Sequence, residues 1–312
     1  MYYIIKTMLK RIRKEAFFIK KLFSQRYELT FYFNYFKNKF FGATLLARLP
    51  SYKCNVDSKL SLHILCQEED VGMIEWSVRS FLEHTGLCPR IIIHDDGTMT
   101  KKSALLLEKR FSNLRVLFKK DALRALSENP GFKGIIKKFS EGGHKVLIQL
   151  IDIFLLSDTE KVILMDGDVL FFKQPQELID FVNGRYPYDA MVSWQNGNYD
   201  LVINDEYSKK YSVRERKAPE MNPGLIVYNK SSISLDKLVE FLNNTKRNYN
   251  DYFLAMTGWA CLLSQSNYKF FSEDKYIIKG RPTGETVMKH FTNPRRHEFF
   301  GYGIDLSRNR RW

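Results

Sequence analysis

Residues 161–172 read Lys161-Val162-Ile163-Leu164-Met165-Asp166-Gly167-Asp168-Val169-Leu170-Phe171-Phe172. The apolar run 162–165 has the length of a buried strand, and it ends at two acids that are one residue apart. Two carboxylates are costly in such apolar surroundings unless a partner compensates their charge. A divalent cation is the usual partner, because Mg²⁺ and Mn²⁺ prefer oxygen ligands and are often shared with substrate phosphates. Since open α/β sheets bind ligands at the carboxyl ends of their strands, the two acids predict a ligand site at that edge.

Strand and helix patterns alternate on both sides of this stretch. Runs of apolar and β-branched residues predict strands at 60–66, 90–94, 115–118, 162–165, 191–194 and 225–228. Apolar residues at helical spacing predict helices at 71–84, 102–111 and 142–156, and the first of these ends at Gly86. Residues 127–139 read as a loop or a broken helix. The alternation predicts an α/β fold with a mostly parallel central sheet flanked by helices.

Positive charge is concentrated at the amino terminus. The chain has a net charge of +14, and residues 1–53 hold twelve Lys and Arg residues against only Glu15 and Glu28. Ten of the fourteen surplus charges therefore lie in this segment. We expect residues 1–53 to form a basic, aromatic helical extension and residues 54–312 to form the main domain.

The extension combines an amphipathic pattern with a group of aromatic residues. Residues 8–24 have helical spacing, with Ile12, Ile19 and Phe23 on one face, and eight aromatic residues follow between 27 and 41. This composition is typical of a helix in the interface of an anionic membrane, while packing on the main domain is an equally good interpretation. A nucleic-acid partner is disfavoured, because no nucleic-acid-binding motif follows the basic segment.

The four cysteines are spread along the chain without a metal-binding or redox spacing; they are Cys54, Cys66, Cys88 and Cys261. We expect them to be reduced thiols of a cytoplasmic protein. The sequence shows no signal peptide and no run of the roughly 18 apolar residues that a membrane-spanning helix needs. It therefore predicts a cytoplasmic chain, with a peripheral position at the cytoplasmic face of a membrane as a further option.

Four motifs, met in the same order, resemble those of nucleotide-sugar glycosyltransferases with the GT-A fold. Asp166-Gly167-Asp168 looks like their D-x-D motif, and segment 141–147 looks like the start of the helix before it in glycogenin-like, family-eight-like enzymes. Segment 222–229 looks like their N-x-G strand, and segment 287–291 looks like the one that carries their late histidine. The resemblance spans residues 60–300. It implies a Rossmann-like GT-A fold and a nucleotide-sugar donor, with UDP as the expected nucleotide.

The resemblance also implies a divalent metal site. Asp166, Asp168 and His290 would be its ligands, with Mn²⁺ or Mg²⁺ as the ion, and Asp166 could contact the ribose instead. The ion would act as a Lewis acid on the negative charge that the nucleotide diphosphate gains as it leaves. Among the three residues, Asp168 is the one we expect to be a direct ligand.

The residues that follow His290 depart from the family. Glycogenin-like enzymes continue with a G-x-x-K-P-W stretch whose lysine contacts the diphosphate, but this chain has Asn293-Pro294-Arg295-Arg296. We expect Arg295 or Arg296 to hold the diphosphate, because a guanidinium binds phosphate in a bidentate way. The departure argues against close kinship with glycogenin but not against the fold. In the helix before the acids, Lys145 is expected to reach the donor's sugar or phosphate.

Two further strand ends lie at the same predicted edge. Cys66 and Gln67 end the first strand, and Asp95 and Asp96 end the second. The second pair opens a turn that resembles the D-D-G-S turn of inverting, family-two-like glycosyltransferases. A plain Asp-Gly turn is the alternative, because this dipeptide is common in turns. We expect these four residues to contact the nucleoside.

The transferred sugar and the acceptor need a pocket of their own. We expect five residues to shape it: Trp194, Asn222, Gly224, Gly258 and Trp259. The glycines would let the backbone approach closely, and the tryptophans would border sugar rings. An inverting reaction would also need a carboxylate base near the acceptor hydroxyl, for which Asp251 and Glu273 are equal candidates.

The motifs favour a metal-dependent glycosyltransferase that acts, by retention or inversion, on a glycan, a lipid-linked molecule or an envelope acceptor. A Mg²⁺-dependent nucleotidyl or phosphoryl transferase is one alternative, since such enzymes also couple paired acids to phosphates. The chain has no G-x-x-x-x-G-K-[ST] loop, which disfavours a P-loop enzyme. The other alternative is a peripheral membrane adaptor with this fold and no activity.

Overall fold

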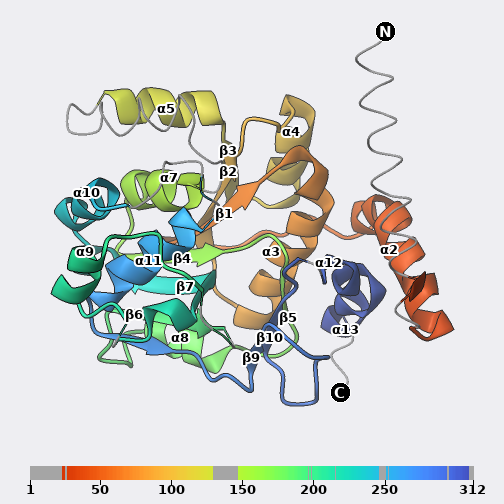
Figure 1. Cartoon of the computed structure of the whole chain (residues 1–312). Coiled ribbons are helices and arrows are strands. Elements are labelled where there is room, and N and C mark those ends of the chain that lie inside the picture. Colours follow the sequence, from red (N-terminus) through yellow and green to blue (C-terminus); the bar gives the residue numbers. More distant parts are fainter. Residues whose placement is uncertain are drawn as a thin grey trace, which may run out of the picture.

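The computed structural model describes residues 23–24, 27–128, 147–195, 197, 199–214, 216–245, 251, 253–293 and 295–308 (Figure 1). Its main sheet has seven strands in the order β3-β2-β1-β4-β7-β6-β8. In chain order these are β1 (Asp57–Cys66), β2 (Pro89–Asp95), β3 (Leu114–Leu117), β4 (Lys161–Met165), β6 (Ala190–Trp194), β7 (Met221–Asn229) and β8 (Tyr268–Phe270). Of the described strands in this sheet, only β7 runs antiparallel to its neighbours. The mostly parallel sheet that the sequence predicts is confirmed.

Helices cover both faces of the sheet (Figure 1). One face carries α3 (Val71–Thr85), α4 (Lys101–Arg110) and α8 (Gln176–Val182), and the other carries α7 (Ile148–Leu156), α10 (Leu235–Asn243) and α11 (Leu254–Ser264). Successive strand residues point to opposite faces. Ile163 and Met165 of β4 therefore join the core under α3, while Val162 and Leu164 join the core under α7 and α11.

Short elements complete the main domain. Helix α3 ends where the sequence predicts, at Gly86, whose φ of 65° is left-handed. The short helices of the main domain are α5 (Lys119–Ser127), α9 (Asp205–Lys210) and the 3₁₀ helices η1 (Glu68–Asp70), η4 (Ala218–Glu220) and η5 (Lys230–Ser232). Of the loop expected at 127–139, Ser127 ends α5 and residues 129–139 lie outside the described residues, as does the first turn of the helix expected at 142–156.

A second, smaller sheet lies next to the two acids. Its order is β5-β10-β9, with β5 at Val169–Phe171, β9 at Tyr276–Ile277 and β10 at Met288–His290. Strand β5 directly follows the acids, and β10 pairs antiparallel with it, so that His290 lies opposite Val169. This pairing brings together two motifs that are more than a hundred residues apart in the sequence.

Helix α2 (Leu29–Ala47) confirms the helical extension over these residues, whereas nearly all of the helix expected at 8–24 lies outside the described part. It packs on the C-terminal segment, which consists of α12 (Arg296–Glu298), the π-helix η6 (Phe299–Gly303) and α13 (Ile304–Arg308) (Figure 1). The Phe31 ring fills the space that a side chain at Gly301 would need, and Asn38 Nδ2 donates to Phe300 O at 2.8 Å. Among the helices that the structure describes, none is long and apolar enough to cross a membrane.

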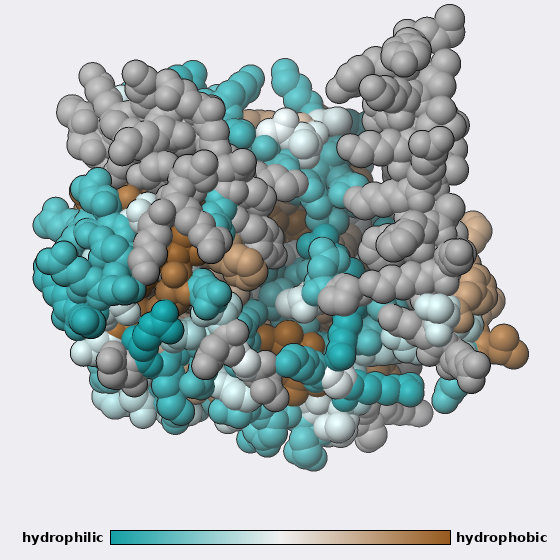
Figure 2. Space-filling model, viewed as in Figure 1, coloured by the Kyte–Doolittle hydropathy of each residue, from teal (hydrophilic) through white to brown (hydrophobic). Residues whose placement is uncertain are grey.

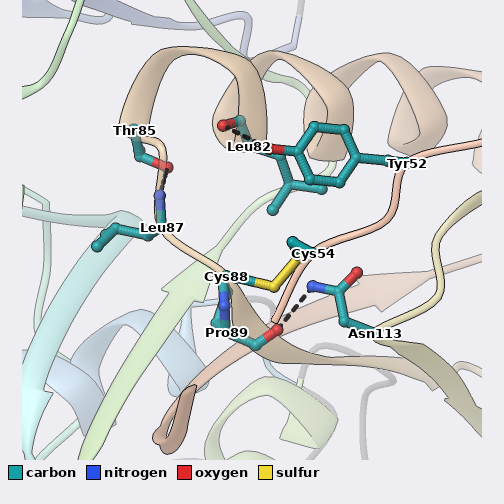
Figure 3. Close-up of a disulfide and its surroundings, with 8 residues drawn as sticks. All are labelled: Tyr52, Cys54, Leu82, Thr85, Leu87, Cys88, Pro89 and Asn113. Atoms are coloured by element: carbon teal, nitrogen blue, oxygen red, sulfur yellow. Dashed lines mark hydrogen bonds between the residues drawn. A yellow bond between two sulfur atoms is a disulfide. The ribbon is translucent and has the colours of Figure 1, made fainter. Parts of the chain in front are cut away.

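Cys54 and Cys88 form a disulfide, with their Cα atoms 6.1 Å apart (Figure 3). The prediction of four reduced thiols is therefore wrong for these two, while Cys66 and Cys261 are free and buried. The bonded cysteines precede β1 and β2, and the pairing of these parallel strands places their starts side by side. A separation of 34 residues in sequence does not reveal this neighbourhood. The cysteines consequently no longer argue for a reducing compartment.

Candidate functional site

The two acids lie in a tight turn at the carboxyl end of β4. Asp166 N–H donates to Gly224 O at 2.9 Å, which ties the turn to β7. Gly167 has no room for a side chain, because a Cβ there would lie 2.7 Å from Cγ1 of Ile74 on α3. The backbone of the D-x-D stretch is thus held between β7 and α3.

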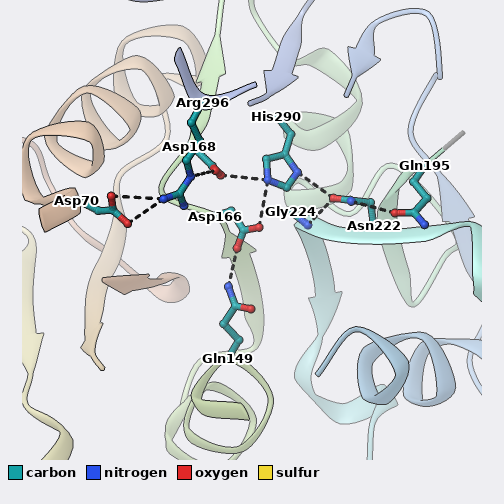
Figure 4. Close-up of polar contacts among 9 residues, drawn as sticks. All are labelled: Asp70, Gln149, Asp166, Asp168, Gln195, Asn222, Gly224, His290 and Arg296. Carbon is teal, nitrogen blue, oxygen red and sulfur yellow. Dashed lines mark hydrogen bonds and ion pairs between the residues drawn. The ribbon is translucent and has the colours of Figure 1, made fainter. Parts of the chain in front are cut away.

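The imidazole of His290 faces both carboxylates (Figure 4). Its Nε2 lies 3.2 Å from Asp166 Oδ2 and 3.0 Å from Asp168 Oδ1. The ring fits against β7 only because residue 224 is glycine, since a Cβ at Gly224 would collide with the imidazole. The sequence predicts that close approach at Gly224 serves a sugar, whereas in the structure it makes room for His290.

Asn222 fixes the orientation of the histidine ring. Its Oδ1 accepts the N–H of Gly224 at 2.9 Å and lies 2.9 Å from His290 Nδ1, while its Nδ2 donates to Gln195 Oε1 at 3.3 Å. Because an amide oxygen can only accept, Nδ1 carries a proton and donates it to Asn222. In the neutral imidazole, Nε2 therefore has the free lone pair and points at the acids. Metal-binding histidines are commonly oriented in this way.

A second set of contacts holds the outer oxygens of the acids (Figure 4). Gln149 Nε2, on α7, donates to Asp166 Oδ1 at 2.5 Å, and Arg296 Nε donates to Asp168 Oδ2 at 2.8 Å. Arg296 Nη1 also lies 3.2 Å from Asp70 Oδ2. Each acid of the D-x-D stretch therefore keeps one oxygen on a donor and turns the other toward His290.

The electrostatics of this group are dominated by mutual pairing. Burial alone would raise the pKa of Asp168, but His290 and Arg296 hold the pKa at about 2. Burial alone would lower the pKa of His290, but the carboxylates of Asp168 and Asp166 raise the pKa to about 10. Without a metal ion, a proton on His290 thus binds the two carboxylates together.

The inward atoms suit a divalent cation. One ligand atom from each of Asp166, Asp168 and His290 lies within 4.8 Å of the other two. Carboxylate oxygens suit Mg²⁺ or Mn²⁺. With His290 neutral, the carboxylates of Asp70, Asp166 and Asp168 and the guanidinium of Arg296 sum to two negative charges, which a divalent cation would balance. The residues present fit the metal that the motif resemblance implies.

A pocket of about 660 Å³ opens beside the acids. Gln67 lines it after the end of β1, Asp96 after β2 and Gln195 after β6. Met256 of α11 lines it as well. The strand ends meet here as the carboxyl edge of an α/β sheet predicts, and the volume is in the range of small-molecule sites.

Of the residues that the sequence predicts at the nucleotide, the structure places only some in the pocket. Gln67, Asp96 and Arg296 line the pocket. Asp95 instead accepts two backbone N–H bonds of its own turn, at 2.8 and 2.9 Å, and the buried Cys66 thiol donates to a backbone oxygen. Both of these side chains therefore stabilise strand ends.

The two neighbouring arginines are separated by the fold. Arg295 lines a second cavity, of about 740 Å³, between α2 and the C-terminal segment. Arg296 is the arginine that contacts the acids. Lys145 lies outside the described residues; the helix in which it was expected reaches the site through Gln149.

Trp259 and Gly258 belong to the core, which corrects their expected place beside a sugar ring. Trp259 is 1% exposed, and its Nε1–H donates to Gln149 O at 3.2 Å. A Cβ at Gly258 would collide with Leu150 of α7. The apolar helix α11 packs both residues against α7 and the sheet. Trp194 donates to Glu220 Oε2 at 2.9 Å and is not one of the described residues that line the pocket.

The two candidate bases, Asp251 and Glu273, are likewise not among the described residues around the pocket. Glu273 is exposed in the turn after β8. Asp251 accepts the N–H of Phe253 at 2.8 Å just before α11. The carboxylates that line the pocket in the described structure are those of Asp70, Asp96, Asp166 and Asp168.

Several polar residues of the site are not predicted from the sequence, among them Asp70, Gln149 and Gln195. Asp70 comes four residues after β1 and Gln195 directly follows β6, so the strand-end rule that selects Gln67 would also select them. Gln149 is one of two polar residues in the apolar helix α7, and an isolated polar residue in such a helix signals a buried partner.

No protein-family model matches the chain, and no curated protein sequence does. Among solved structures, the bifunctional glycosyltransferase WbbM matches 83% of this chain with a TM-score of 0.50 and 12% identity. This chain spans 51% of WbbM. Mouse xyloside xylosyltransferase 1 matches 77% of this chain and 99% of its own length, with a TM-score of 0.46 and 9% identity. The galactosyltransferase LgtC matches 79% of this chain and 95% of its own length, with a TM-score of 0.45 and 11% identity. From the WbbM match and the strand topology, the chain has the Rossmann-like GT-A fold found among glycosyltransferases.

Proposed function

We propose that the chain is a metal-dependent glycosyltransferase that moves a sugar from a nucleotide-sugar donor, with UDP as the nucleotide, to a glycan, lipid-linked or envelope acceptor. One observation carries the proposal: Asp166, Asp168 and His290 turn three ligand atoms toward one another at the carboxyl edge of a GT-A sheet. The fold supports glycosyl transfer as the reaction class. The resemblance of the D-x-D, N-x-G and histidine motifs supports the nucleotide-sugar donor.

The residues of the site have separate tasks in this proposal. A bound Mn²⁺ or Mg²⁺ would act as a Lewis acid on the leaving diphosphate. Asp166, Asp168 and His290 would hold the ion, while Asn222 keeps the histidine tautomer in which Nε2 is free. Arg296 would contact the diphosphate, since it borders the acids and its side chain is 32% exposed. Its N–H donors would then stabilise the charge that develops on the leaving group.

The remaining pocket residues would bind the two ends of the donor. Gln67 and Asp96 would contact the nucleoside, because they follow the neighbouring strands β1 and β2. Gln195 and Asn222 are joined by a hydrogen bond of 3.3 Å. They would border the transferred sugar together with Met256.

Thermal unfolding of the full chain with UDP, GDP, CDP and ATP, each with Mn²⁺ or with EDTA, tests this proposal. We expect UDP to raise Tm when Mn²⁺ is present and not in EDTA, because a ligand that binds only the folded state stabilises it. Smaller shifts are expected with GDP and CDP. A shift with ATP and metal but not with UDP would overturn the proposal in favour of nucleotidyl or phosphoryl transfer. No shift with any nucleotide would favour an inactive adaptor.

The proposal includes a peripheral position at an anionic membrane surface. Its support is the cluster of ten surplus positive charges in residues 1–53. From that position the chain would meet an acceptor that is carried by a lipid.

A further inference from the structure

Helix α2 has two faces of opposite character. On its inward face, Phe31, Tyr35 and Leu46 are at most 7% exposed and pack in the core formed with α3 and the C-terminal segment. The outward face consists of Leu29, Phe33, Phe40 and Phe41, which are 86%, 70%, 59% and 63% exposed. At about 100° per residue, Leu29, Phe33 and Phe40 fall within about 40° of one another and directly opposite Phe31. Leu29, Phe33 and Phe40 therefore form an apolar stripe, and Phe41 flanks this stripe about 100° further around the helix.

The rest of the surface is different. Five of the nine large hydrophobic side chains that are exposed in the described part of the chain lie between residues 23 and 41. Figure 2 shows hydrophobic residues gathered at the edge of the molecule that α2 forms. Scattered apolar residues are normal on a protein surface, but a contiguous group marks an interaction site.

The charge around the stripe indicates what covers it. No acidic residue occurs from 29 to 53, whereas Lys39, Arg48 and Lys53 are basic. Lys37 is basic as well, but it is paired with Asp305 at 2.8 Å. A second copy of the chain would bring two such basic faces together, and residues 1–22, with seven basic residues and one acid, would add further positive charge. An anionic lipid surface offers both the opposite charge and an apolar interior.

We propose that the outward face of α2 is the surface that enters the interface of an anionic lipid bilayer. The inference rests on the peripheral position in the proposed function, and it assigns that position to Leu29, Phe33, Phe40 and Phe41. The phenylalanine rings would lie among the lipid head groups and acyl chains, while Lys39 and Arg48 would meet the anionic head groups.

The docking of α2 connects this surface to the site. Tyr27, just before α2, places its hydroxyl 2.8 Å from His297 Nε2. His297 follows Arg296, whose guanidinium contacts Asp168. The Tyr27–His297 contact therefore links the lipid-binding helix α2 directly to the segment that carries Arg296.

Co-sedimentation of the full chain with vesicles tests the inference. The vesicles are phosphatidylcholine alone or mixed with phosphatidylglycerol, at rising salt. The test variant is Phe33→Glu/Phe40→Glu, and both positions are exposed, so the fold should tolerate it. The matched control is Leu105→Glu/Leu106→Glu on α4, where the side chains are 66% and 42% exposed. The metal-dependent Tm shift with UDP is measured for all three proteins.

We expect the wild-type chain and the control to bind the anionic vesicles and to lose binding as salt rises. The Phe33→Glu/Phe40→Glu variant should partition at least about tenfold less, because it places two carboxylates in the interface. Equal binding by the two variants would overturn the inference and leave the peripheral position to another part of residues 1–53. A wild-type chain that ignores anionic vesicles, or that forms a dimer which the test variant dissolves, would overturn it too. The UDP shift reports separately on the glycosyltransferase proposal.

Discussion

Lys289 and His290 are neighbours on β10, yet their side chains enter two buried charged sites of opposite design. In the lysine–glutamate site, Lys289 Nζ donates to Glu298 Oε2 at 2.7 Å, to Tyr302 Oη at 2.8 Å and to Gly280 O. These three partners use every N–H of the ammonium group. In the acid–histidine site, Asp166, Asp168 and His290 instead face one another with three ligand atoms.

The difference shows that buried charge alone does not identify a functional site. Lys289 is 0% exposed and its partner Glu298 is 12% exposed. Burial lowers the pKa of Lys289, and Glu298 opposes that shift. This site is closed to a further ligand because its charges are already paired. The acid–histidine site differs in two ways: it lines a pocket, and its three ligand atoms can hold a cation in place of the proton on His290.

Asp168→Asn in the acid–histidine site should impair the protein most. The change removes one carboxylate ligand while keeping the shape of the side chain. We expect loss of Mn²⁺-dependent UDP binding and at least about a 1,000-fold loss of sugar transfer, since the ion carries much of the leaving-group stabilisation. Asp158→Asn, before the other end of β4, is the matched control and should keep full activity. Full activity of Asp168→Asn would contradict the metal mechanism.

The lysine–glutamate site should respond in stability and not in ligand binding. Glu298→Gln leaves the charge of Lys289 buried without a counter-charge, which costs about 3 kcal/mol of unfolding free energy. Urea unfolding would measure the loss, with Glu285→Gln, an exposed position, as the control. The metal-dependent UDP shift should survive at temperatures where the variant is folded. If Glu298→Gln abolishes UDP binding and leaves the unfolding free energy unchanged, the lysine–glutamate site binds ligand and is not a purely structural site.

Asn222→Ala tests the orientation of His290 by itself, because it leaves all three metal ligands in place. The histidine loses the acceptor that fixes its tautomer, so metal affinity should fall by about 10- to 100-fold. Titration of Mn²⁺ followed by the Tm shift with UDP would measure it. Asn229→Ala, at the far end of β7, serves as the control. An unchanged affinity would mean that the Asn222 contact does not orient His290.

Asp152 of α7 is a third buried charge, and the smallest effect is expected there. Its Oδ1 has no hydrogen-bond partner among the described residues, and burial raises the pKa of the carboxyl to about 7. The folded-state pKa exceeds the unfolded value of 3.8, so stability is lost as pH rises toward 7. Asp152→Asn cannot ionise. The unfolding free energy of the wild type should therefore fall relative to that of Asp152→Asn as the pH rises from 6 to 8. This change should be at most about 1.4 kcal/mol. A difference that does not change with pH would contradict this assignment.

The sheet and its ligand edge could be predicted because their signals are local. Apolar runs mark the strands, and the run that ends at Asp166 and Asp168 marks the edge where ligands bind. Gln67 and Asp96 follow from the same rule and line the pocket. His290 could be predicted only from the motif resemblance, because a single histidine in a sequence does not show whether its side chain lies in the core or in a site.

The rest depends on three-dimensional packing that no local pattern contains. Arg295 and Arg296 are adjacent, and the turn into α12 alone decides which one reaches Asp168. The Cys54–Cys88 pair depends on the neighbourhood of β1 and β2. A tryptophan ring suits both a sugar site and a core, and the apolar helix around Trp259 is typical of a core element.

The C-terminal segment on which α2 packs leaves the ribosome long after the helix itself. Asn38 and Phe300, which hydrogen-bond to each other, are 262 residues apart. At about 5–20 residues per second, the segment that covers Phe31 emerges roughly 10–50 s after the helix does. During that interval Phe31 and Asn38 lack the C-terminal residues that they contact in the folded chain. If the outward face of α2 binds lipid as proposed, the helix can therefore contact a bilayer before the C-terminal segment has packed against its inward face.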